Sequence, residues 1–237
     1  MHSSHLEPDH APLKRLLMGC AASILAVVFL RLGSEAMEGA THAFDLRVLL
    51  AARSLGVRYP WLSAVMRDLS GLGSTVVLTL FTVATVGYLA LVSARITAAL
   101  VATSVGLGTV LVSVFKAGFA RPRPDGAYAE LVGSDLSFPS GHASMSAIVF
   151  LTVGVLLARS RASLAERVYI LTTVAVLAFL VGLSRVALGV HWATDVLAGW
   201  AFGTAWAIGW LLLAHRLGRP GGAKPAAATA GLPHVNP

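Results

Sequence analysis

The chain of 237 residues is 56% apolar and only 12% charged, with a formal net charge of +7. Soluble domains carry about 25% charged residues, so this composition indicates a membrane protein. The basic residues lie mainly between apolar runs and do not alternate with aromatic residues, which argues against nucleic-acid binding. The single cysteine, Cys20, excludes an intrachain disulfide and a multi-cysteine metal cluster.

The first apolar run covers about residues 16 to 30 and follows Lys14 and Arg15. A signal peptide has the same charged start, but this run ends at Arg31 without a convincing small-residue cleavage site. We therefore expect an uncleaved first membrane span. Residues 1–13 are polar, and we expect a flexible N-terminus there.

Two stretches between residues 33 and 70 have the apolar periodicity of amphipathic helices. The first opposes an apolar face to a polar face that includes Asp45, and the second carries Trp61 on its apolar face. Both are typical of interfacial helices, with Trp61 near the level of the lipid headgroups. Packing against the membrane spans is an equally valid interpretation.

Five further apolar runs follow, and a helix needs about 20 residues to cross roughly 30 Å of hydrocarbon. The run that begins at Ala143 is short, so its helix must include Gly141 or His142 or lie partly below the surface. We interpret Gly199 and Gly203, four residues apart, as internal packing positions rather than as a dimer contact. The runs cover residues 72–93, 96–115, 143–158, 168–183 and 196–214.

The sequence thus predicts an all-α polytopic membrane bundle of about six transmembrane helices with short interfacial helices. We expect a single domain over residues 14–215, with its active site formed by the connections 116–142 and 184–195. Residues 216–237 are rich in Gly, Pro and Ala, and we expect a disordered tail there.

Six spans place the connections 116–142 and 184–195 on the same side of the membrane. The opposite side collects basic residues with few acidic companions, so the positive-inside rule makes it cytoplasmic and the two connections extracytoplasmic. Arginines between residues 31 and 67 weaken this bias, because they also lie on the outer side. The basic residues of the cytoplasmic set are Lys14, Arg15, Arg95, Arg159, Arg161, Arg167, Arg216, Arg219 and Lys224.

The second connection contains Arg185, His191 and Asp195 between two apolar runs. Charge beside a membrane span is costly unless it is paired or lines a polar cavity, although short loops also carry ordinary solvated charges. If Asp195 opens a helix, its spacing from His191 places both on one face. Asp195 can then accept from one imidazole nitrogen and leave the other free to react.

The first connection ends with Ser140, Gly141 and His142 against an apolar run. Ser140 is a good helix N-cap, so the backbone donors behind it would point at an anion. Guanidinium groups match phosphate oxygens in a bidentate way, so nearby arginines favour a phosphate ligand. The cations available to such a site are Lys116, Arg123 and Arg185.

The order and spacing of these residues resemble the three-part signature of the type 2 phosphatidic acid phosphatase superfamily. At about 5% usage per residue type, four fixed residues recur by chance at roughly one position in 10⁵. Three parts in order, with every spacing met, make coincidence remote. The parts are Lys116 with Arg123-Pro124, then Pro139-Ser140-Gly141-His142, then Ser184-Arg185 with His191 and Asp195.

The resemblance implies a metal-independent phosphatase without a cofactor, in which a lipid phosphate reacts through a phosphohistidine intermediate. It implies that His191 is the nucleophile, that Asp195 sets its tautomer and that His142 is the general acid. It further implies a set of residues that bind the phosphoryl oxygens, namely Lys116, Arg123, Ser140, Gly141 and Arg185.

Arg121-Pro122 and Arg123-Pro124 are tandem copies. Only Arg123 has the family's spacing from Lys116, so we interpret Arg121 as a loop or headgroup contact. We assign no role to His215.

Two other site chemistries are open to the same residues. His142, His191 and Asp195 are a possible zinc ligand set, but three neighbouring cations argue against a metal. Vanadium-dependent haloperoxidases have a similar site, yet they are soluble. We therefore expect no metal.

The interfacial position of the site favours a lipid substrate in a lipid bilayer, without nucleic acid. The family implies phosphatidate, phosphatidylglycerol phosphate, a polyprenyl diphosphate such as undecaprenyl diphosphate, or lipid A 1-phosphate. A lipid phosphotransferase with the same site and a non-catalytic lipid-binding or transport protein are the alternatives. We expect a bacterial inner-membrane location with an extracytoplasmic site, and the oligomeric state stays open.

Overall fold

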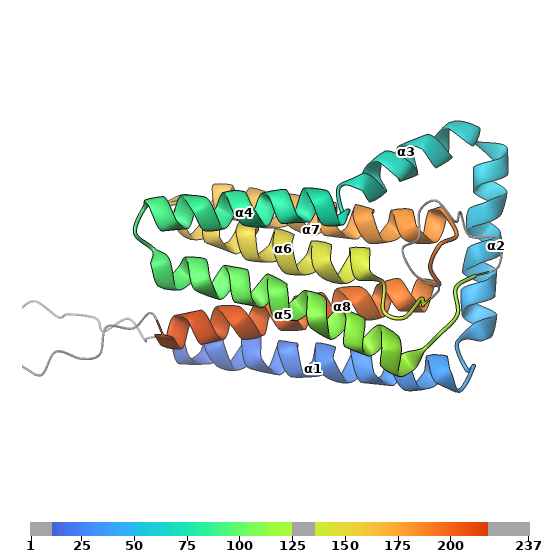
Figure 1. Ribbon diagram of the computed structural model, residues 1–237, viewed down its shortest axis with the longest axis horizontal. Helices are drawn as coiled ribbons and strands as arrows, with labels where there is room; N and C mark the ends of the chain where they lie inside the picture. The colour runs from blue at the N-terminus through green and yellow to red at the C-terminus, as the bar shows by residue number, and fades with distance from the viewer. Residues whose placement is uncertain (1–10, 125–135, 218–237) are drawn as a thin grey trace, which may run out of the picture.

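The computed structural model describes residues 11–124 and 136–217, which form helices joined by short connections (Figure 1). Six segments of this part are long and apolar enough to cross a membrane, which confirms the predicted all-α bundle. The predicted N-terminal flexibility and the tail fall mostly outside the described residues. The helices are α1 (Ala11–Met37), α2 (His42–Arg58), α3 (Pro60–Gly71), α4 (Thr75–Leu91), α5 (Arg95–Phe119), α6 (Gly141–Arg159), α7 (Leu164–Ala187) and α8 (Ala193–Leu217).

Helices α6 and α8 form the centre of the bundle, and small residues bring their backbones together. A Cβ atom added to Gly203 would lie 2.5 Å from the carbonyl oxygen of Ser144, and one on Gly199 would lie 2.9 Å from that of Ser140. These contacts confirm that the two glycines serve internal packing. The helix α6 begins at Gly141, which is one of the alternatives that the short apolar run left open.

The outer faces of the spans are apolar and exposed. On α4, Leu80 is 67% exposed and Val83 is 62% exposed, and α7 exposes Tyr169 at 73%. A contiguous apolar surface of this kind is unusual on a soluble monomer. It fits helices that face the hydrocarbon of a bilayer.

Helix α2 lies across the end of the bundle where α1 and α5 end and α6 and α8 begin, and α3 leads from it to α4 (Figure 1). Asp45, which the sequence places on the polar face of α2, is fully buried, whereas Phe44 on the apolar face is 44% exposed. The interfacial interpretation would have left this polar face in water, and it is wrong at Asp45. At this point α2 covers polar connections rather than hydrocarbon, so the face that it buries is polar.

Candidate active site

His191 and Asp195 meet at the start of α8. His191 lies in the tight connection after α7, where Gly189 adopts a φ of +68°. Asp195 lies in the first turn of α8, and its Oδ2 is 3.4 Å from Nδ1 of His191. The His191 side chain is 2% exposed and that of Asp195 is fully buried. The predicted pairing of these two residues is thus present.

The neighbours of His191 define its tautomer. A guanidinium group can only donate, and Nη1 of Arg123 lies 3.0 Å from Nε2 of His191. The Nε2 atom must therefore accept, so Nδ1 carries the hydrogen and faces the Asp195 carboxylate. The lone pair of Nε2 points toward Arg123, which is where a bound anion would be held.

The protonation state of His191 follows from its burial. Burial lowers the pKa of His191 to about 3 from the ordinary value of 6.5, and the Asp195 carboxylate opposes this effect only in part. The imidazole is therefore neutral at physiological pH. A neutral ring, with a lone pair on Nε2, is the form that can act as a nucleophile.

The three predicted cations come together from different elements. Nζ of Lys116, near the end of α5, donates to the carbonyl oxygens of Leu136 at 2.8 Å and Ser137 at 3.3 Å. Nη1 of Arg123 donates to the carbonyl oxygen of Val190 at 2.6 Å. The Arg123 bond ties the two connections together, and the Lys116 bonds hold its ammonium group within the first connection. Both cations act electrostatically on His191.

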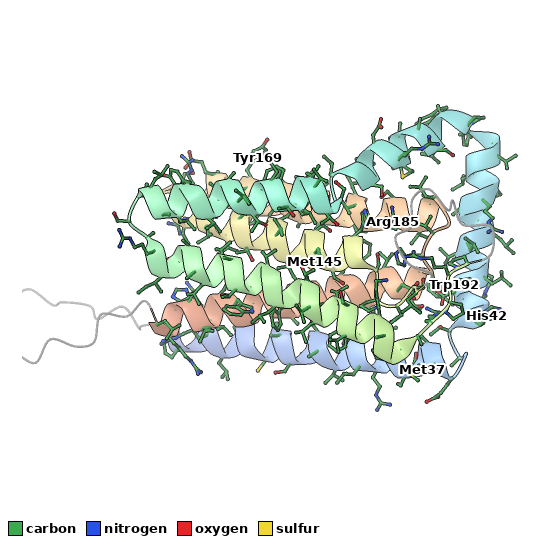
Figure 2. All side chains as sticks on the ribbon, viewed as in Figure 1. Met37, His42, Met145, Tyr169, Arg185 and Trp192 are labelled. Atoms are coloured by element: carbon green, nitrogen blue, oxygen red, sulfur yellow. The ribbon has the colours of Figure 1, made fainter. Side chains whose placement is uncertain are left out.

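Arg185 is the third cation, from the last turn of α7. Its Nη1 donates to the hydroxyl oxygen of Ser70, at the end of α3, at 2.6 Å. Arg185 acts electrostatically on both Lys116 and His142, so the three groups share one site. Figure 2 shows Arg185 and Trp192 at the end of the bundle that α2 covers.

The start of α6 supplies the backbone donors of the site. Ser140 is its N-cap, as predicted, and its Oγ accepts from the backbone N–H of Ala143 at 3.5 Å. The N–H of Ser140 donates to the carbonyl oxygen of Asp195 at 3.0 Å, which joins α6 to α8. Gly141 and His142 follow in the first turn, and a Cβ on Gly141 would lie 4.0 Å from Cε of Lys116.

Arg121 lies in a buried ion-pair network, so its interpretation as a loop or headgroup contact is wrong. Its Nη1 donates to Oδ1 of Asp195 at 2.6 Å, and its Nη2 donates to Oδ2 of Asp45 at 2.7 Å. Thr194 completes the network, because its backbone N–H donates to Oδ1 of Asp45 at 2.9 Å. The tandem copy Arg121-Pro122, which precedes the Arg123-Pro124 pair, was the only sequence signal for this role.

Ser137 is a further site residue that the sequence reasoning missed. Its hydroxyl donates to Oδ2 of Asp195 and lies 3.3 Å from Nδ1 of His191. The backbone N–H of Trp192 donates to the same carboxylate oxygen at 2.9 Å. Asp195 is therefore held by neighbours on both sides. The position of Ser137, two residues before the Pro139-Ser140-Gly141-His142 motif, was the available signal.

A groove of about 210 Å³ leads away from the site between α4, α5 and α6. Its polar end contains Lys116 and His142, and its walls include the apolar residues Leu78, Val112 and Met145. A groove that is cationic at one end and apolar along its length suits an amphiphile with an anionic head.

All eight predicted site residues thus lie at one end of the bundle. In the part of the chain that the structure describes, no three His, Cys, Asp or Glu side chains are arranged to hold a metal ion.

Comparison with known proteins defines the class. The PAP2 superfamily model matches residues 97–219. The chain is 35% identical over 184 residues to phosphatidylglycerophosphatase B of Bacillus subtilis (strain 168), a match that covers 76% of this chain and 87% of that protein.

Two crystal structures are similar. The transmembrane PAP2 type phosphatidylglycerolphosphate phosphatase from Bacillus subtilis is 29% identical with a TM-score of 0.76, over 84% of this chain and 98% of that one. Aquifex aeolicus LpxE is 26% identical with a TM-score of 0.53, and the match covers 70% of this chain and 93% of that one. Fold and site define an integral membrane phosphatase. The chain belongs to the PAP2 superfamily, which confirms the resemblance drawn from the sequence.

Proposed function

We propose that this enzyme hydrolyses the phosphomonoester of a glycerophospholipid, with phosphatidylglycerol phosphate as the first candidate, through a phosphohistidine intermediate. The observation that carries the proposal is the arrangement of His191, whose Nδ1 faces Asp195 while Nε2 faces Arg123. The named activity of the Bacillus subtilis relative supports this choice of substrate. The groove between α4 and α5 supplies room for part of a lipid tail.

In the first step, Nε2 of His191 attacks phosphorus and the bond from phosphorus to the lipid oxygen breaks. His142 gives a proton to the departing oxygen, so the lipid leaves as an alcohol. The negative charge of the bound phosphate favours the protonated form of His142 that this step needs. Asp195 stabilises the positive charge that develops on the ring of His191.

In the second step, water attacks the phosphohistidine and gives its proton to His142. The bond from phosphorus to Nε2 breaks, and inorganic phosphate is released. The phosphoryl oxygens are bound throughout by the donors that surround them, since phosphoryl transfer depends chiefly on positioning and electrostatics. These donors are Lys116, Arg123, Arg185, the Ser140 hydroxyl and the Gly141 backbone N–H.

The orientation of the enzyme is a second part of the proposal. We place the active site on the extracytoplasmic side of a bacterial inner membrane. Lys14, Arg95 and Arg159 lie at helix ends away from the site, together with Arg161 and Arg167, and this clustering of basic residues is typical of the cytoplasmic side.

The test is phosphate release by the detergent-purified protein from phosphatidylglycerol phosphate, phosphatidate, undecaprenyl diphosphate and a water-soluble phosphomonoester, with a chelator present. We expect the highest kcat/KM for phosphatidylglycerol phosphate. His191→Ala should lower kcat by at least about 10³-fold, because the nucleophile is lost. A 32P label that remains on His191 of acid-quenched protein would identify the intermediate.

Three outcomes would contradict the proposal. Unchanged turnover in folded His191→Ala protein would exclude the nucleophile. A higher kcat/KM for undecaprenyl diphosphate would replace the proposed substrate. Label that appears on an acceptor lipid instead of in inorganic phosphate would identify a phosphotransferase.

A further inference from the structure

A second cavity lies at the opposite end of the bundle from the active site. It has a volume of about 620 Å³ and lies between the start of α1, the start of α5 and the ends of α6 and α8. Along α5, its residue Ser104 lies twelve positions before Lys116, or about 18 Å at 1.5 Å per residue. None of its lining residues belongs to the site of the proposed reaction.

The mouth of this cavity is cationic. Lys14, Arg15 and Arg159 line it, and the lining residues that the structure describes include no acidic side chain. Lys14 and Arg159 are exposed. Nη2 of Arg159 lies 2.5 Å from Nε2 of His215, so the two helix ends are joined at the mouth. Basic residues next to a membrane span attract anionic lipid headgroups.

The walls of the cavity are apolar. Leu100 and Val101 contribute from α5, Leu156 from α6, and Trp210 and Leu211 from α8. A small free anion could bind at the cationic mouth, but it would leave the apolar walls of the cavity without a partner. Such an anion alone therefore does not match the whole cavity. The combination is complementary to an amphiphile that has a negative head and a hydrocarbon tail.

Two buried hydroxyl groups lie deeper in the same cavity. Ser104 and Thr152 line it and are 1% and 6% exposed. Neither hydroxyl oxygen has a hydrogen-bond partner among the residues that the structure describes. Other hydroxyls in the spans find a local partner, as Thr103 does by donating to the carbonyl oxygen of Ala99 at 2.7 Å. Buried polar groups without a partner are rare, because losing water costs free energy.

The two hydroxyls also lie at matching depths. Thr152 precedes Arg159 by seven residues on α6, and Ser104 follows Thr97 by seven on α5, each about 10 Å along its helix from the mouth. An acceptor at this depth on the ligand would satisfy both. An ester carbonyl of a glycerophospholipid lies between the phosphate and the acyl chains, which is the order of groups that the cavity presents.

We propose that this cavity is a second, non-catalytic lipid site that binds one anionic diacyl glycerophospholipid from the leaflet opposite the active site. The phosphate contacts Lys14, Arg15 and Arg159, an ester carbonyl accepts from the hydroxyls of Ser104 and Thr152, and an acyl chain covers the apolar walls. The site neither requires nor affects the reaction proposed above, so the two proposals stand or fall separately.

The test is native mass spectrometry of the full chain in detergent, with phosphatidylserine and phosphatidylcholine of identical acyl chains as probes. We expect one phosphatidylserine to bind at least about fivefold more tightly than phosphatidylcholine. The double variant Lys14→Gln/Arg159→Gln should weaken phosphatidylserine binding about 25-fold, at about fivefold per charge. Thr152→Val should weaken it about two- to tenfold through the lost hydrogen bond.

Matched controls separate this site from general electrostatics and from the active site. Arg161→Gln removes an exposed cation at the same end that does not line the cavity, and Arg185→Gln alters the active site. Both control variants should bind phosphatidylserine as tightly as the wild type does. Thermal midpoints and basal phosphate release show whether the cavity variants are folded, and Lys14→Gln alone serves as the test if the double variant is unstable.

Several results would overturn the inference. The anionic site would be excluded if the two lipids bound equally well or if the cavity variants bound phosphatidylserine as tightly as the wild type. It would also be excluded if Arg161→Gln weakened phosphatidylserine binding as much as the cavity variants do. Loss in Arg185→Gln would place the lipid at the active site. Displacement of the lipid by inorganic phosphate at the same concentration would show an anion site without a lipid chain.

Discussion

At the scale of single residues, the carboxylate of Asp195 connects His191, the proposed nucleophile, to a remote helix. One oxygen faces Nδ1 of His191, and the other accepts a hydrogen bond from Arg121 at 2.6 Å. Arg121 in turn forms an ion pair with Asp45 of α2. Buried charges are costly unless every one of them is paired. The orientation of His191 therefore depends on Asp45, which lies outside the proposed phosphate site.

We expect Asp45→Asn to weaken both folding and catalysis. Removing one member of a buried ion pair costs about 3–5 kcal/mol, and a small displacement of a reacting group can cost about 10²-fold in rate. The free energy of unfolding and kcat should both fall while KM changes little, because Asp45 positions Arg121 rather than the substrate. Asp68→Asn, an exposed change on α3, is the matched control. A fall in stability at unchanged kcat would reduce Asp45 to a purely structural role.

The protonation of His191 makes stability depend on pH. Its pKa is about 3 in the folded protein and about 6.5 in the unfolded chain, so the unfolded chain binds this proton more tightly. The contribution of neutral His191 to the free energy of unfolding is complete above about pH 6.5 and is lost as pH falls toward 3. The thermal midpoint of the wild type should therefore decrease more than that of His191→Gln between about pH 6.5 and 4. Parallel curves for the two proteins would contradict the assignment.

At the scale of elements, the contact between α6 and α8 sets the geometry of the site. Ser140 and His142 begin one of these helices and Asp195 begins the other, so their separation depends on how closely the helices approach. Gly203 permits this approach, because its position faces the backbone of Ser144. The packing of the two spans therefore brings together His142 and His191, the proposed acid and the proposed nucleophile.

We expect Gly203→Ala to lower the free energy of unfolding by about 1–3 kcal/mol, as overpacking of a close contact does. The added Cβ would lie 2.5 Å from the carbonyl oxygen of Ser144 and 2.8 Å from Cβ of Ala147. Gly209→Ala on the same helix is the control, since nothing lies within 4 Å of a Cβ there. Thermal unfolding in detergent measures both. Equal thermal midpoints for the two variants would show that α6 and α8 can move apart without loss of stability.

At the scale of the whole molecule, the active site and the second cavity occupy opposite ends of one bundle. α1 joins the two ends, because it starts beside the cavity and packs against the site end through Phe29, which contacts Phe138 with a ring-centroid distance of 5.7 Å. A bilayer around the apolar outer faces would therefore separate the two sites into different leaflets.

The proposed orientation predicts which end is accessible from outside the cell. Glu38, after α1, lies at the site end, and Ala162, before α7, lies at the other end, and both are exposed. In a Cys20→Ala background, Glu38→Cys should react with a membrane-impermeant maleimide in intact cells. Ala162→Cys should react only after permeabilisation. The reverse pattern would invert the orientation.

The sequence by itself determined the features that depend on local spacing. Hydropathy indicated six spans, because crossing hydrocarbon requires a long apolar run. The N-cap at Ser140 and the approach of His191 to Asp195 also followed from the chain alone, since both involve residues within a few positions of each other. The resemblance to the family's three-part signature likewise identified the cations Lys116, Arg123 and Arg185 from their order and spacing.

Only the tertiary structure decided how distant segments meet. Asp45 lies 150 positions before Asp195, and a polar face on an amphipathic helix has the same periodicity whether it faces water or a buried arginine. The roles of Arg121 and Ser137 were hidden for the same reason. The cavity beside Lys14 was equally invisible, because its cations and hydroxyls come from three helices whose approach is set by packing rather than by any pattern along the chain.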